Sequence, residues 1–84
     1  MNTETIRDKV AAEVRAATAR KGMSATELSR ASGISTAALN RKMRGLVSFT
    51  VEELLSIADV TGTPADVLII PAVEETPALI STRA

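Results

Sequence analysis

The sequence predicts an all-α domain built from five short helices and a short C-terminal tail. Three observations support this fold class. Apolar residues recur at the three- and four-residue spacing of helices that bury one face. A Ser/Thr-x-x-Glu pattern, which caps helix N-termini, occurs twice, and no segment alternates like a strand. The 84 residues make one small domain, whose folded part we place at residues 1–71, with a flexible or dimer-contacting tail at residues 72–84.

The first helix is expected over residues 3–21. Its buried face is predicted to carry Ile6, Val10, Val14 and Ala17, which lie at helical spacing. Two basic residues occupy the favourable last turn, and Gly22 follows them as a left-handed terminating residue.

The second and third helices are expected at about residues 24–32 and 35–44, with a tight turn between them. Ser24 and Glu27 are spaced as a capping box that opens the second helix, which should turn Leu28 and Ala31 inward. Gly33 permits the turn, Ile34 fills the space beneath it, and Ser35 caps the third helix, which Gly45 ends.

The fourth and fifth helices follow a second capping box, Thr50 to Glu53, flanked by Phe49 and Leu54 at the spacing of a hydrophobic staple. The buried stripe of the fourth helix is predicted as Val51, Leu54, Leu55 and Ala58, with its end near Gly62. Pro64 suits the first turn of the fifth helix, and Pro71 should end it. Four apolar residues near that end should seal the core or form a dimer seam, and we favour partial use in a dimer: Val67, Ile69, Ile70 and Val73.

Charge is distributed unevenly along a chain whose formal net charge is zero. Residues 15–45 hold seven Lys or Arg against Glu27 alone, whereas residues 46–84 hold six Asp or Glu against Arg83 alone. This asymmetry indicates one face that binds a polyanion and another that repels it. Without His, Cys or a glycine-rich phosphate loop, the sequence offers no catalytic, metal or cofactor site, and no small-molecule ligand is evident. A protein of the cytoplasm, with no membrane partner, is expected.

The second helix, the Gly-containing turn and the third helix have the proportions of a helix-turn-helix. Leu28 and Leu39 can meet in the core, and Ser29 is small enough for the third helix to pass close to it. These residues stand in "SATELSRASGISTAALNRKMRG", followed by "FTVEELLSIADVTGTPADVL". Over residues 10–70 the chain resembles the lambda repressor and Cro-type (Xre-like) helix-turn-helix family. The resemblance implies a five-helix domain that binds operator DNA, usually as a symmetric dimer. It is similar to small phage and bacterial regulators of the Cro or immunity-repressor kind.

The third helix has a face suited to the major groove. Leu39 and Met43 should face the core, so that the opposite side combines small residues with Arg41 and Arg44. Arg binds guanine and Asn binds adenine through paired hydrogen bonds, and the methyl groups of Thr and Ala can contact thymine. Together with the family resemblance, this predicts four base-contacting residues, Arg41 first among them: Thr36, Ala37, Asn40 and Arg41.

Phosphate contacts are expected from helix N-termini and from nearby cations. The predicted set is Lys21, Ser24, Thr26, Ser35, Lys42, Arg44 and Ser48. Ser24 and Ser35 can act as helix caps as well, and Arg15, Arg20 and Arg30 are interpreted as solvated.

The sequence therefore predicts a transcriptional regulator that binds a double-stranded, pseudo-palindromic DNA operator as a homodimer. One alternative is a helix-turn-helix module that binds a protein. It is favoured by Ala25, where the family often has a phosphate-binding Gln, and by the lack of cations in residues 46–50. A DNA-architectural or recombination-directionality factor is a further alternative.

Overall fold

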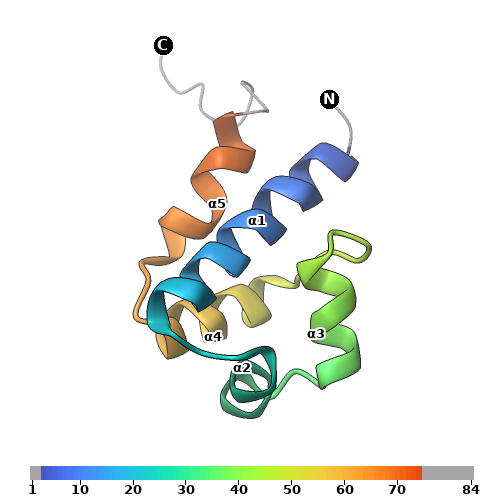
Figure 1. Ribbon diagram of the computed structural model, residues 1–84. Helices are drawn as coiled ribbons and strands as arrows, with labels where there is room; N and C mark the ends of the chain where they lie inside the picture. Colours follow the sequence, from blue (N-terminus) through green and yellow to red (C-terminus); the bar gives the residue numbers. More distant parts are fainter. Residues whose placement is uncertain (1–2, 75–84) are drawn as a thin grey trace.

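Five helices make up most of residues 3–74, which are the residues that this computed structural model describes (Figure 1). They are α1 (Thr3–Lys21), α2 (Ala25–Ser32), α3 (Thr36–Met43), α4 (Val51–Thr61) and α5 (Ala65–Glu74). Residues 3–74 contain no strand, so the predicted all-α fold class is confirmed. The part of the predicted tail from residue 75 onward lies outside the described residues.

Helix α1 organises the packing. It lies beside α5 over most of its length, and it also contacts α3 and α4 (Figure 1). Helix α2 packs between α3 and α4. One aliphatic cluster joins all five helices, with these members: Val14, Ala17, Leu28, Ile34, Leu39, Ile57, Ala58 and Leu68.

Side-chain caps define where α2 and α4 begin. The Ser24 hydroxyl accepts a hydrogen bond from the Glu27 amide (3.1 Å), and the Ser24 amide donates to the Glu27 carboxylate (2.8 Å). Thr50 and Glu53 make the same reciprocal pair at 3.0 and 2.8 Å. Both predicted capping boxes are confirmed, and each satisfies two amides that the helix itself leaves without acceptors.

Two predictions of buried helical faces are wrong. Ala31 is exposed, because α2 turns Leu28 and the flank formed by Ser29 and Ser32 toward its neighbours. In α4, Val51 and Leu55 are 71% and 55% exposed.

The buried face of α4 is instead formed by Leu54, Ile57, Ala58 and Thr61. This stripe has the same three- and four-residue spacing as the predicted one and differs only by a rotation about the helix axis. A threonine can complete such a stripe because its hydroxyl finds an acceptor in its own helix. In this case the Thr61 hydroxyl donates to the Ile57 carbonyl at 2.7 Å.

The prediction that Pro71 ends the fifth helix is also wrong, because α5 continues through Pro71 to Glu74. Proline lacks the amide that would bond the carbonyl of Val67, four residues earlier, and this weakens the helix. Packing against α1 offsets that loss, since Leu68 and Ala72 on either side of the proline are both buried.

Candidate nucleic-acid interface

Helices α2 and α3 are joined as the helix-turn-helix prediction requires. Gly33 follows α2 with a φ of +82°, a left-handed conformation that glycine adopts at little cost. The Ser29 hydroxyl donates to the Ile34 carbonyl and accepts from the Thr36 hydroxyl at 3.2 Å. A larger residue at position 29 would separate the two helices, so this serine fixes how closely α3 approaches α2.

The two sides of α3 differ as predicted. Leu39 is fully buried, and Ala38 and Met43 pack against the core. The exposed side carries all four predicted base-contacting residues together with Arg44: Thr36, Ala37, Asn40, Arg41 and Arg44. Within residues 3–74 the guanidinium groups of Arg41 and Arg44 make no hydrogen bond or ion pair. Two cations on this side of α3 are therefore available to an external ligand.

Lys42 does not share that exposed side. Its ammonium bonds both carboxylate oxygens of Glu53, at 2.7 and 2.6 Å, and the two side chains are only 13% and 21% exposed. Burial acts to raise the pKa of Glu53, but hydrogen bonds from Lys42 and from the Thr50 amide outweigh it and hold that pKa below its ordinary value. Lys42 thus ties α3 to the N-terminus of α4, and the structure does not present it as a free cation for phosphate.

The other predicted phosphate residues lie at several places. Lys21 and Thr26 are exposed near the junction of α1 and α2, and the hydroxyls of Ser24 and Ser35 accept bonds from helix amides. The carboxylate of Glu27 occupies part of the α2 N-terminus. Hydrogen bonds from the backbone and hydroxyl of Ser24 hold its pKa below the ordinary value, so it stays ionised there. Only the amides of Ala25 and Thr26 in that first turn remain without an intrahelical acceptor.

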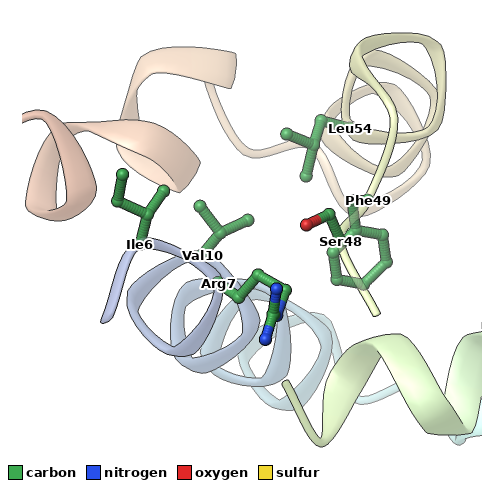
Figure 2. A pocket seen from close by; sticks show the side chains of 6 residues that line it. All are labelled: Ile6, Arg7, Val10, Ser48, Phe49 and Leu54. Atoms are coloured by element: carbon green, nitrogen blue, oxygen red, sulfur yellow. The ribbon is translucent and has the colours of Figure 1, made fainter. Parts of the chain in front are cut away.

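Ser48 is the remaining member of the predicted phosphate set. It is exposed in the connector between α3 and α4 (residues 44–50). Its side chain lines a pocket beside α1 rather than joining the exposed side of α3 (Figure 2).

Two arginines of α1 support the end of α3, a role that the sequence did not reveal. The Arg15 guanidinium donates to the Met43 carbonyl, and Arg7 Nε donates to the Gly45 carbonyl at 3.2 Å. The sequence suggested that Arg15 is solvated, whereas the structure shows that it also contacts α3. The one feature of the sequence that could have indicated this role is the spacing of eight residues between Arg7 and Arg15, which places both on one side of α1. From there they reach carbonyls at the C-terminus of α3 that the helix leaves without donors.

Gly45, at the same end of α3, has a φ of +79° and is buried. A Cβ at this position would lie 2.5 Å from Oδ1 of Asp8, the end of an exposed side chain that can turn away, so it is the left-handed backbone conformation that favours glycine here.

The apolar residues near the end of α5 are divided between core and surface. Val67, Ile69 and Ile70 are 38%, 39% and 43% exposed, and Val73 is half-buried. Leu68 and Ala72 supply the core contacts instead. The predicted seam therefore remains accessible to a partner.

Comparison with known proteins agrees with this geometry. The structure is similar to crystal structures of the clp gene regulator ClgR from Corynebacterium glutamicum. One has a TM-score of 0.75 at 28% identity and covers 83% of this chain and 74% of that chain. Another has a TM-score of 0.74 at 26% identity, covering 93% and 96%. No curated protein sequence matches significantly. The family model described as the BetR domain matches residues 2–81, almost the whole length, and the chain therefore belongs to the BetR domain family.

Proposed function

We propose that this chain is a transcriptional regulator that binds double-stranded DNA, with α3 as the recognition helix in the major groove. The observation that carries the proposal is the exposed side of α3, where small side chains accompany two arginines whose guanidinium groups have no partner within residues 3–74. Small residues let a helix approach base edges closely, and an arginine guanidinium can donate two hydrogen bonds to guanine, one to O6 and one to N7. The similarity to a clp gene regulator supports a role in gene regulation rather than catalysis, and hence a site of action in the cytoplasm.

Sequence preference is proposed to arise from four residues of α3: Thr36, Ala37, Asn40 and Arg41. The phosphate contacts come from Arg44, Lys21, Thr26 and the capped N-termini at Ser24 and Ser35. Lys42 is withdrawn from this set because Glu53 neutralises it, and Ser48 is withdrawn because it lies beside the α1 pocket. The remaining contacts are few, so a single copy should bind weakly and a dimer would gain affinity from two half-sites.

The proposed dimer uses the exposed apolar surface at the end of α5, which includes Val67, Ile69 and Ile70. A two-fold arrangement would set two α3 helices about 34 Å apart on a pseudo-palindromic operator. This finer assignment, a Cro-like or immunity-repressor-like protein, rests on the sequence resemblance and on the accessibility of these side chains.

A second candidate function, binding to another protein, is favoured by one observation. All the large aliphatic side chains that are strongly exposed within residues 3–74 lie between Leu46 and Ile70. That part of the chain contains carboxylates but no Lys or Arg. Such a surface suits a basic, apolar protein partner better than it suits DNA.

Selection of bound sequences from a random pool of double-stranded DNA separates these functions. The regulator proposal predicts enrichment of a palindromic consensus whose half-sites are about one helical turn apart. Enrichment of a single half-site would support α3 as the recognition helix and contradict the proposed dimer. No enrichment at low salt, where phosphate contacts are strongest, would reject DNA recognition and leave the protein-binding candidate.

A further inference from the structure

A pocket of about 240 Å³ opens between the first half of α1, the connector and the start of α4 (Figure 2). Four apolar side chains from these three elements form most of its lining: Ile6, Val10, Phe49 and Leu54. Aliphatic and aromatic surface that faces open space in this way costs free energy in water, and an apolar ligand would relieve that cost.

The same pocket carries two polar groups with hydrogen-bond donors to spare. Arg7 uses Nε for the Gly45 carbonyl, and its two terminal nitrogens have no partner within residues 3–74. The Ser48 hydroxyl also makes no hydrogen bond in that part of the chain, and Figure 2 shows it directed from the connector toward the side of Val10. Among the described side chains of residues 5–74, no carboxylate lines the pocket, so this lining is positively charged.

We propose that this pocket binds a small amphipathic carboxylate. The alkyl chain would lie against Ile6, Val10 and Leu54, and the carboxylate would accept hydrogen bonds from Arg7 and Ser48. Guanidinium and carboxylate form the strong, charge-assisted class of hydrogen bond, which selects an acid over a neutral molecule of the same length.

The volume limits the ligand to a short chain. An apolar cavity of about 150 Å³ holds benzene, which has six heavy atoms, so 240 Å³ admits about ten. Octanoate has that size and is the probe of choice. For so few atoms we expect a dissociation constant on the order of 1 mM or below.

A ligand bound in this pocket would also restrict the motion of α3. Arg7 holds the Gly45 carbonyl directly after that helix, so a ligand that immobilises the guanidinium also stiffens the end of α3. Ligand binding itself does not depend on DNA recognition, so a titration with the ligand gives a clear result whether or not the chain binds DNA.

The test is an NMR titration of the full chain with sodium octanoate, kept below the concentration at which octanoate forms micelles. Methyl shifts should be confined to Ile6, Val10 and Leu54. Arg7→Gln should weaken binding about tenfold or more, whereas Arg20→Gln, which changes an exposed arginine elsewhere on α1, should leave it unchanged. Ser48→Leu fills the mouth of the pocket from the exposed connector and should abolish binding even if Arg7→Gln perturbs the fold.

Three results would overturn the proposal. The first is binding that does not depend on the carboxylate. It would be seen as equal binding of octanol and octanoate, or as equal binding by wild type and Arg7→Gln, and it would indicate apolar adsorption only. The second is a set of shifts centred on the exposed side chains of α5. The third is octanoate binding that appears only after removal of residues 75–84, which would assign the pocket to the chain's own Leu79 and Ile80.

Discussion

At the scale of single residues, Glu53 connects α3, the proposed recognition helix, to the rest of the domain. One carboxylate caps the Thr50 amide and pairs with the Lys42 ammonium, so the positions of α3 and α4 depend on the same group. The capping role was predicted from a spacing of three residues. The ion pair was not, because Lys42 and Glu53 are brought together by the turn of the connector rather than by helical spacing.

Glu53→Gln should lower the free energy of unfolding by about 1 kcal/mol at pH 7, because the amide oxygen can still cap α4 but no longer pairs with Lys42. The folded state lowers the pKa of Glu53, so the wild-type carboxylate stabilises the fold fully at pH values above its ordinary pKa of 4.5. That stabilisation, and with it the difference between the two proteins, disappears as the pH falls through the folded pKa. Urea unfolding of both proteins between pH 7 and pH 3 measures this difference. Glu52→Gln is the matched control, since Glu52 is exposed, and a similar difference for both variants would contradict the account.

At the scale of elements, helix boundaries were predicted better than helix orientations. Caps are local chemical signals. The structure places α2 between Ser24 and Gly33, and α4 between Thr50 and Gly62. The orientation of α4 depends on what packs against it. Two stripes of equal spacing compete, and the sequence alone does not show that Ile57 rather than Leu55 meets the core.

Replacing each of these two residues by alanine tests the orientation of α4. Ile57→Ala should cost about 2–4 kcal/mol of unfolding free energy, because it leaves a cavity in the aliphatic cluster. Leu55→Ala should change it by no more than about 0.5 kcal/mol, because that side chain is already 55% exposed. Thermal or urea denaturation suffices, and equal costs would mean that the helix is rotated from the position described.

Pro71 offers a gain in stability within α5. Pro71→Ala restores an amide that can donate to the Val67 carbonyl and removes the steric conflict of the ring, while it increases the entropy of the unfolded chain. The net effect should be a rise of about 1–2 kcal/mol in unfolding free energy, visible as a higher urea midpoint. A lower midpoint would show that the proline ring supplies packing worth more than the missing hydrogen bond.

At the scale of the whole molecule, charge and exposed apolar surface are segregated. The half up to Gly45 holds nine of the ten Lys and Arg residues, and the half after it holds six of the ten Asp and Glu residues. Within the described residues, every strongly exposed large aliphatic side chain follows Gly45. The charge asymmetry was evident in the sequence, because it depends only on which residues are present. The exposure of Arg41 and Arg44 was also predicted, and they have no partner in residues 3–74. The engagement of Lys42, Arg7 and Arg15 within the fold was not, because it depends on which helices pack together.

The proposed recognition of DNA sequence by the exposed side of α3 depends first on Arg41, so we would measure the effect of replacing it. Fluorescence anisotropy should compare binding to a selected sequence with binding to its scrambled counterpart for wild type, Arg41→Ala and the control Arg20→Ala. We predict that Arg41→Ala reduces the preference for the selected sequence by about tenfold or more, the value of one paired contact to guanine. Arg20→Ala should leave that preference intact. An unchanged preference in Arg41→Ala would contradict the assignment of α3 as the recognition helix.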